Sequence, residues 1–247
     1  IPALSNVLYS EDILFPIADF YLKKERWNEA IEVYEEMETI GALQGRGAEY
    51  YQKLGYALQK NKKYAEAIDA YLKADTLKPD NIWNNRHLAI CYRLNRNYQA
   101  ALSYYKKVEE ATPEDTNVIF HIGSCLAELG QYEEAANYFF KLDFIESNCI
   151  KAWRGIGWCS FISRKYEQAM KYYEKIIEQK PLAIDYMNAG HVAWTMGDIQ
   201  KATALYGKSI TANGNRERFL EMFRKDKEAL LKQGIQEEDI PLMLDLL

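Results

Sequence analysis

Apolar and polar residues alternate along this chain with a helical period, and the same phrase returns at a nearly constant interval. Three stretches show it most clearly: YAEAIDAYLKADTLKP at 64–79, YQAALSYYKKVEEATP at 98–113 and YEQAMKYYEKIIEQKP at 166–181. In each, an aromatic residue stands three positions before an alanine and another stands four positions after it. These intervals place the three side chains on one stripe of an α-helix. The pattern therefore predicts a repeated amphipathic helix.

The alanine in the middle of the phrase marks the repeat. It recurs at Ala30, Ala67, Ala101, Ala135, Ala169 and Ala202, and the successive spacings are 37, 34, 34, 34 and 33. A large side chain at this position would hold a neighbouring helix away, so the alanine predicts close helix packing. Pro79, Pro113 and Pro181 each follow such an alanine at a spacing of twelve. They are expected to end the helix, because proline has no N–H to donate.

A second helix is predicted ahead of each phrase. The segments YQKLGYAL at 51–58, IFHIGSCL at 119–126 and WRGIGWCS at 153–160 share a large residue followed by an aliphatic residue and a glycine. Glycine inside a helix costs about 1 kcal/mol relative to alanine. Close contact between helices at Gly55, Gly123 and Gly157 is the expected compensation.

These phrases together resemble the tetratricopeptide repeat family, whose repeating unit carries a large residue, Leu-Gly and Tyr in one helix, then Ala, an aromatic residue and Pro. The resemblance covers residues 11–216 and implies an all-α fold, a right-handed superhelical solenoid of stacked antiparallel helix pairs. About six units are expected within an array spanning 1–216: 11–47, 48–81, 82–115, 116–149, 150–182 and 183–216. The first unit has Pro16 in its first helix and an insertion near Gly45, so its entry is expected to be kinked.

The period ends after residue 216, but apolar residues keep a helical spacing. Phe219, Met222, Phe223 and Leu230 fall on one side of the next segment. A solenoid leaves its last apolar face uncovered, so 217–247 is expected to form capping helices. An alternative is that residues 242–247 form an exposed hook for a partner or for another copy of the chain.

Composition and charge limit the kinds of function. Of the 247 residues, 48% are apolar and 27% are charged, which predicts a folded chain, and the net charge of -5 does not favour nucleic acid as a partner. No apolar run approaches the roughly 18 residues of a membrane span, so none is expected. The chain begins at Ile1 rather than Met. We therefore expect a piece of a longer protein, whose missing segment could carry a targeting signal.

Motifs for chemistry are missing. The sequence has no GxxxxGK[ST], GxSxG, HExxH or CxxC, so neither catalysis nor a cofactor or metal is expected. Cys91, Cys125 and Cys159 each precede their alanine by the same spacing of ten, which predicts a slot for a small buried side chain. Cys149 lies between units. Four thiols without predicted partners favour a reducing compartment, and a cytoplasmic location is expected.

A possible binding surface runs along the first helices of the pairs. The positions that precede each alanine by 18, 15, 11 and 8 form one helical stripe, and the family resemblance places first helices on an inner, concave wall. Together with the neighbouring histidines and arginines, the candidate peptide-binding residues are Gln52, Tyr56, Trp83, Arg86, His87, Arg93, Asn117, Phe120, His121, Lys151, Arg154, Trp158, His191 and Trp194.

The chemistry of this wall indicates its partner. Arg86, Arg93, Lys151 and Arg154 stand against a single acid, Glu49. Tryptophan and arginine often dominate binding energy in grooves. A basic, aromatic trough suits an acidic peptide or a free C-terminal carboxylate, which a guanidinium can grip through two hydrogen bonds.

The sequence thus predicts a non-catalytic protein–protein interaction scaffold that binds a peptide or protein segment in its groove. Some members of the family clamp a C-terminal carboxylate with Lys and Asn in neighbouring units. Gln52 and Tyr56, then Arg86 and Ile90, stand at the matching positions, so the full clamp is absent. Two alternatives remain: a self-assembling structural module that uses its terminal helices, or a single-stranded nucleic-acid binder that uses the histidine and aromatic lining.

Overall fold

A computed structural model describes residues 11–41 and 46–247, and within these residues every regular element is a helix. The chain divides into two compact units, Ile1–Pro113 and Glu114–Leu247, here called unit 1 and unit 2. The expected all-α fold of stacked helix pairs is confirmed. The insertion predicted near Gly45 lies outside the described residues, and the boundary predicted at residue 216 stays a prediction.

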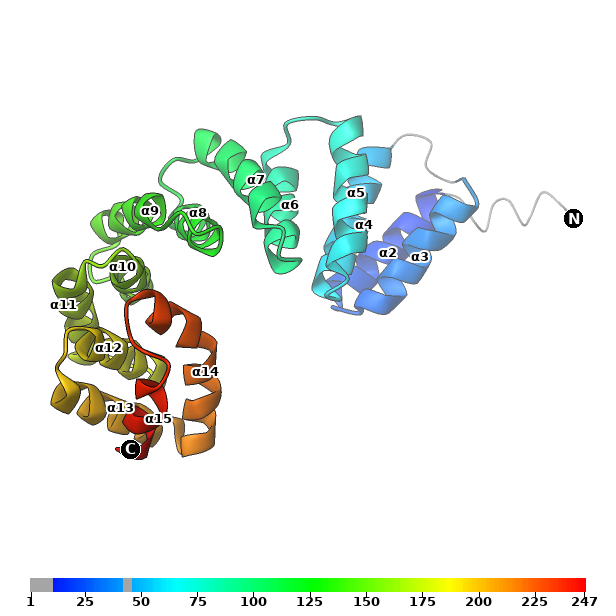
Figure 1. Ribbon diagram of the computed structural model, residues 1–247. Helices are drawn as coiled ribbons and strands as arrows, with labels where there is room; N and C mark the ends of the chain where they lie inside the picture. Colours follow the sequence, from blue (N-terminus) through cyan, green and yellow to red (C-terminus); the bar gives the residue numbers. More distant parts are fainter. Residues whose placement is uncertain (1–10, 42–45) are drawn as a thin grey trace, which may run out of the picture. The chain divides into compact units, whose positions relative to one another are not determined.

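The described residues of unit 1 form three helix pairs (Figure 1). Its helices are α2 (Glu11–Lys23), α3 (Trp27–Thr39), α4 (Gly47–Lys60), α5 (Tyr64–Leu77), α6 (Ile82–Leu94) and α7 (Tyr98–Ala111). Each helix packs on its partner, and α3 and α5 pack on the first helix of the following pair. Helix α2 continues through Pro16.

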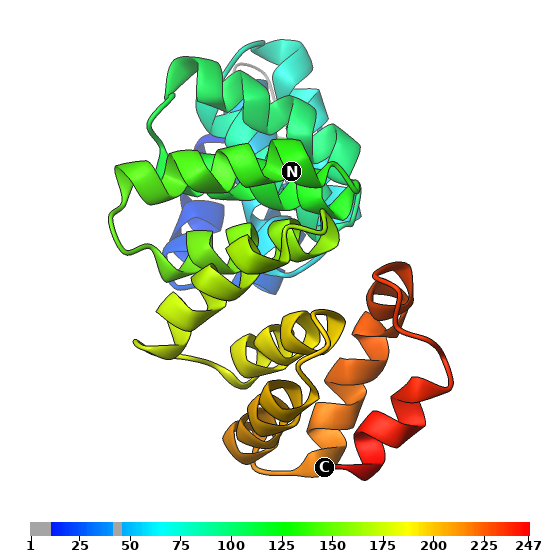
Figure 2. The same ribbon diagram turned by 60° about the vertical axis from the view of Figure 1, so that its left-hand side comes forward.

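Unit 2 contains three more pairs and two further helices, which Figure 2 shows from another side. Its helices are α8 (Thr116–Glu128), α9 (Tyr132–Ile145), α10 (Ile150–Ile162), α11 (Tyr166–Ile177), α12 (Ala183–Thr195), α13 (Ile199–Asn213), α14 (Arg216–Lys232) and α15 (Asp239–Asp245). The same order of packing recurs, α8 on α9, α9 on α10 and so on to α13 on α14.

The repeated alanine lies at the centre of every pair. Ala30, Ala67, Ala101, Ala135, Ala169 and Ala202 are all fully buried. The aromatic residue four positions later is buried in each pair as well, for example Tyr71 and Tyr173. Interlocking of large side chains around a small one, as the sequence predicted, therefore builds the core.

The glycines of the first helices let these aromatic rings approach the backbone. A methyl group at Gly55 would lie 2.8 Å from the Tyr71 ring, and one at Gly190 would lie 2.5 Å from the Tyr206 ring. Real carbon atoms do not approach so closely, so each ring packs directly on the helix backbone. The expected compensation for glycine in these helices is confirmed.

One residue in each turn between paired helices has a left-handed backbone conformation. These residues are Glu25, Lys62, Arg96, Gly130, Arg164 and Gly197, with φ between 56° and 84°. Glycine adopts this conformation without strain, whereas other residues are disfavoured there by about 1 kcal/mol or more. The four turns with Glu25, Lys62, Arg96 and Arg164 are therefore slightly strained, whereas the two turns with glycine are not.

The last helices cap unit 2. Helix α14 packs on α12 and α13 and buries Phe219, Phe223 and Leu230. Helix α15 buries Ile240 and Met243, while Leu242 and Leu246 are each 64% exposed. The predicted capping segment is confirmed. None of the helices in the described part of the chain combines the length and the apolar character that crossing a bilayer takes.

Candidate functional site

The predicted binding stripe lies on the first helices, and unit 1 contributes an aromatic cluster from α4, α5 and α6. The imidazole of His87 stands 4.0 Å from the Trp83 ring, 5.6 Å from the Tyr56 ring and 5.7 Å from the Tyr71 ring, measured between centroids. Its Nδ1 atom lies 2.7 Å from Gln59 Oε1. His87 therefore fills the space where α6 packs on α4 and α5.

Burial changes the acid–base behaviour of this imidazole. Desolvation, with smaller contributions from the charges of Lys60 and Arg86, lowers the pKa of His87 to about 4. The ring is therefore neutral near pH 7 and acts as a packing residue. Trp83 beside it remains 42% exposed, so the cluster presents a large aromatic surface to solvent.

The remaining predicted residues of unit 1 lie beside this cluster. Gln52 and Arg86 are partly buried on α4 and α6. Arg93 Nε donates a hydrogen bond of 3.4 Å to the hydroxyl oxygen of Tyr105. The guanidinium of Arg93 is thus drawn towards the second helix of its own pair.

Unit 2 holds a pocket of about 370 Å³ between α8, α9 and α10. Its walls are mostly apolar, with a few charged groups near the edge: Phe120, Ser124, Ala127, Glu128, Phe139, Lys151, Arg154, Gly155, Trp158 and Cys159. Four of the predicted residues, Phe120, Lys151, Arg154 and Trp158, meet here. Pockets of this size and character are typical of ligand sites.

Lys151 is a cation available at this pocket's edge. Its Nζ atom lies 5.8 Å from the centroid of the Phe120 ring and 3.4 Å from Glu146 Oε2. Both partners of this ion pair are more than a third exposed, and such pairs contribute at most about 1 kcal/mol. A ligand carboxylate could therefore compete for Lys151.

Arg154, in contrast, is committed to the framework. Its Nε and Nη2 atoms donate hydrogen bonds of 2.7 Å each to the two carboxylate oxygens of Asp185 on α12. This bidentate pairing raises the pKa of Arg154, and Asp185 also accepts a hydrogen bond from the backbone N–H of Leu182. We therefore assign Arg154 to joining α10 to α12 and not to gripping a ligand.

His191 and Trp194, predicted on the same wall, are covered by α14. The Nδ1 atom of His191 lies 2.8 Å from the Tyr206 hydroxyl, and its Nε2 atom lies 3.4 Å from Asp226 Oδ2. The imidazole ring stands 5.3 Å from Phe223, and the side chain is fully buried. We leave both residues out of the proposed binding surface.

The other two predicted residues lie on α8. Asn117 is exposed in the first turn, and His121 is partly buried with its ring 5.4 Å from Phe120. They share α8 with the lining residues Phe120 and Ser124 but do not line the pocket themselves.

The predicted burial of Cys91, Cys125 and Cys159 is confirmed, and Cys149 is buried as well. Desolvation raises the pKa of Cys91 and Cys159 to about 12, so both thiols stay protonated near neutral pH and are poor nucleophiles. Cys159 reaches the pocket wall only as a small apolar group. The cytoplasmic location expected from the thiols stays a prediction.

Three important residues are not identified by the sequence patterns. No sequence motif marks Asp185, because its partner Arg154 lies 31 residues away on another helix. Gly155 resembles the packing glycine Gly157, although the two face different rings: Phe139 and Tyr173 respectively. Ser124 belongs to the predicted stripe but has neither the charge nor the ring that marks a candidate. Aligning repeats sets Gly155 against His87 and Ser124 against Tyr56, which is the signal that could have found them.

Comparisons with known proteins identify the class of this array. Models of the tetratricopeptide repeat match residues 14–44, 48–81, 93–159, 150–181 and 186–216. The chain therefore belongs to the tetratricopeptide repeat family.

Solved structures agree with this assignment. A tetratricopeptide repeat protein from Parabacteroides merdae is 20% identical, with a TM-score of 0.67 over 98% of this chain and 99% of that one. YrrB, described as having an unusual peptide-binding site, is 20% identical, with a TM-score of 0.61 over 77% and 96%. MamA from Desulfovibrio magneticus RS-1 is 18% identical, with a TM-score of 0.61 over 69% and 97%. These likenesses show the fold. No curated protein matches the chain.

Proposed function

We propose that this protein is a non-catalytic interaction scaffold that binds a peptide or protein segment on its first helices. The observation that carries the proposal is the pocket between α8 and α10, where Phe120 and Trp158 form apolar walls beside Lys151. Aromatic side chains that border a pocket next to a cation are typical anchors of binding energy.

Two further observations support the proposal. Trp83 in unit 1 is 42% exposed although tryptophan is usually covered, so this unit offers a second aromatic surface. The family commonly mediates protein–protein interaction, and the related YrrB structure is described by its peptide-binding site. We propose the same general role for this chain.

The predicted preference for acidic partners depends on fewer cationic side chains at this pocket than the four that the sequence analysis named. Arg154 is held by Asp185, which leaves Lys151 as the cation that a carboxylate would meet at this pocket. We propose a modest acidic preference here, worth less than a bidentate arginine contact would give.

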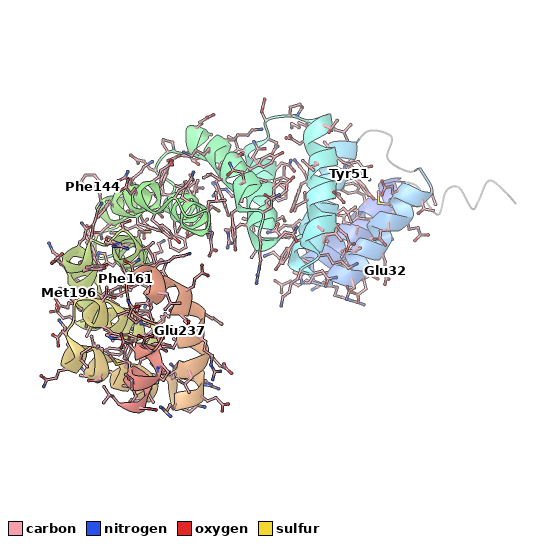
Figure 3. The ribbon with its side chains drawn as sticks, viewed as in Figure 1. Glu32, Tyr51, Phe144, Phe161, Met196 and Glu237 are labelled. Atoms are coloured by element: carbon pink, nitrogen blue, oxygen red, sulfur yellow. The ribbon has the colours of Figure 1, made fainter. Side chains whose placement is uncertain are left out.

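Peptide display on phage against the full chain tests this function. We expect selected peptides to bind the wild-type chain and to lose at least about tenfold in affinity, or about 1.4 kcal/mol, when Trp158→Ala and Lys151→Ala are combined. Phe144→Ala is the matched control, because Phe144 is 89% exposed and projects away from α9 (Figure 3). Failure to select any binding peptide would count against the scaffold function itself.

A second candidate function is self-assembly through α15. Leu242 and Leu246 are each 64% exposed on this short helix. If they contact another copy, the double change Leu242→Glu and Leu246→Glu will convert an oligomer to a monomer in multi-angle light scattering. A wild-type chain that stays monomeric across a hundredfold concentration range would exclude this role.

A further inference from the structure

The pocket in unit 2 has a filled counterpart in unit 1. The first is the unit 2 junction, where α10 packs on α8 and α9, and the second is the unit 1 junction, where α6 packs on α4 and α5. Equivalent residues in the two junctions differ by 68 in number, which is two repeats. The equivalent pairs are Tyr56 and Ser124, Gln59 and Ala127, Tyr71 and Phe139, Trp83 and Lys151, and His87 and Gly155.

Side chains occupy the unit 1 junction. The His87 ring stacks on Tyr71 with an interplanar angle of 28°, and its centroid stands 5.6 Å from that of Tyr56 and 4.0 Å from that of Trp83. Gln59 Oε1 accepts a hydrogen bond from the Tyr71 hydroxyl, and the same atom lies 2.7 Å from Nδ1 of the His87 imidazole. The space between the helices is thereby taken by the protein's own residues.

The same space is open in the unit 2 junction. Glycine replaces the imidazole, serine replaces a tyrosine and alanine replaces a glutamine. A methyl group at Gly155 would lie 2.5 Å from the Phe139 ring, so the ring forms a floor against the bare backbone of α10. The substitutions remove two rings and an amide, and a pocket of about 370 Å³ is present at this junction.

Two residues that have no aromatic counterpart in unit 1 form the walls of this pocket. Phe120 stands where unit 1 has Gln52, and Trp158 stands where it has Ile90. Phe120, Phe139 and Trp158 thus line a mostly apolar pocket, and its other lining residues include the partly exposed Lys151 and the exposed Glu128. An apolar interior with an available cation at the rim fits a bulky apolar side chain that has a carboxylate next to it.

We infer that the unit 2 pocket is an anchor socket for one bulky apolar side chain of a bound peptide, with an adjacent acidic residue paired to Lys151. The inference rests on the proposed scaffold function and names the class of segment that this site selects. Where histidine, tyrosine and glutamine are replaced by smaller residues, the ligand side chain takes the place that the protein's own rings take in unit 1.

Titration with three short probes tests the socket: the N-acetyl dipeptide amides Asp-Trp, Asp-Ala and Lys-Trp. Binding is followed through the backbone amide signals of Gly155 and Ser124 in isotope-labelled protein. We expect Asp-Trp to bind at least about tenfold more tightly than Asp-Ala, and a few-fold more tightly than Lys-Trp. Lys151→Glu should reverse the order of Asp-Trp and Lys-Trp.

Ser124→Tyr restores the ring that unit 1 carries and should abolish binding of Asp-Trp. Ala127→Gln restores the smaller amide and should weaken binding several-fold, so the test does not depend on one variant that fails to fold. Phe144→Ala, on the far side of α9, should leave binding unchanged. Equal binding of Asp-Trp and Asp-Ala, or undiminished binding by Ser124→Tyr, would overturn the socket.

The result separates the socket from the scaffold function. If peptides selected by display bind the chain and keep their affinity in Ser124→Tyr, the scaffold function stands and the socket is wrong. If those peptides each carry a bulky apolar residue beside an acidic one and lose affinity in Ser124→Tyr, both are supported.

Discussion

The unit 1 junction and the unit 2 junction are built on the same repeat positions, yet one is filled and the other is open. His87, Tyr56 and Gln59 occupy the first, whereas Gly155, Ser124 and Ala127 leave the second to be filled from outside. A repeat protein can thus keep its stacking geometry constant while individual positions either stabilise a junction or turn it into a site. The difference lies mainly at positions that face the neighbouring pair, because the buried alanine is kept and the core aromatic residue changes only from Tyr71 to Phe139.

The largest expected effect concerns the residue that holds Arg154 against α12. Asp185→Ala removes a buried carboxylate that accepts two hydrogen bonds from Arg154 and one from the backbone N–H of Leu182, which should lower the free energy of unfolding by roughly 3–5 kcal/mol. Lys201→Ala, which breaks the exposed pair with Glu174, is the control and should cost under about 0.5 kcal/mol. Urea denaturation measures both. Equal effects would show that Arg154 is not committed to the framework.

Opening the unit 1 junction should come next in size. His87→Gly removes the imidazole from between three aromatic rings and adds a helical glycine, for a combined cost of roughly 3 kcal/mol. Combined with Tyr56→Ser, it should create a second pocket that binds the Asp-Trp dipeptide. A double variant that is destabilised but gains no binding would show that the open space alone does not make a socket.

Acid should weaken unit 1 through the same histidine. Burial lowers the pKa of His87 from the usual 6.5 to about 4, so the unfolded chain binds this proton more readily than the folded chain. The stability due to the neutral ring is fully present above pH 6.5 and is lost as the pH falls towards 4, by roughly 2–3 kcal/mol at pH 4.5. Urea denaturation at pH 7 and 4.5 checks this.

Other groups also titrate over this range, so the comparison with a variant decides the matter. In His87→Phe an aromatic ring still fills the space, but it cannot be protonated. The loss of unfolding free energy between pH 7 and 4.5 should therefore be smaller than in the wild-type chain by roughly 2–3 kcal/mol. An unchanged loss would place the acid sensitivity elsewhere.

The smallest expected effect lies in the turns beside the two junctions. Lys62 has a φ of 63° in the turn between α4 and α5 of unit 1, where the matching turn of unit 2 has Gly130 with a φ of 77°. Lys62→Gly should therefore stabilise the chain by about 0.5–1 kcal/mol, while Gly130→Ala should destabilise it by a similar amount. Thermal unfolding of both variants measures the pair, and shifts of the same sign would contradict the account.

Much of this fold was predictable because its signals are local and repeated. Each alanine lies on one helix with the large residues that flank it, and six copies in register define the period. The residues of the binding stripe could be named for the same reason. Their availability could not, because exposure depends on side chains from other elements.

The buried part of the predicted wall illustrates this limit. Helix α14, which covers His191 and Trp194, follows the point where the period ends, so the sequence predicts a capping helix there without showing which residues of the wall it covers. Phe161 of the same stripe stands 6.5 Å from His191 and is 1% exposed (Figure 3). Gly155 could not be identified as a candidate for a similar reason. It leaves space because it has no side chain where unit 1 has His87, and only a comparison of the repeats shows this difference.

Titration of isotope-labelled protein with the N-acetyl Asp-Trp dipeptide amide, followed through the protein's tryptophan indole N–H signals, tests the central claim most directly. Trp158 reports on the unit 2 junction and Trp83 on the unit 1 junction. The account predicts a saturable shift of the Trp158 signal, with the Trp83 signal unchanged, and loss of the shift in Ser124→Tyr. Shifts of equal size at both tryptophans, or at neither, would contradict it.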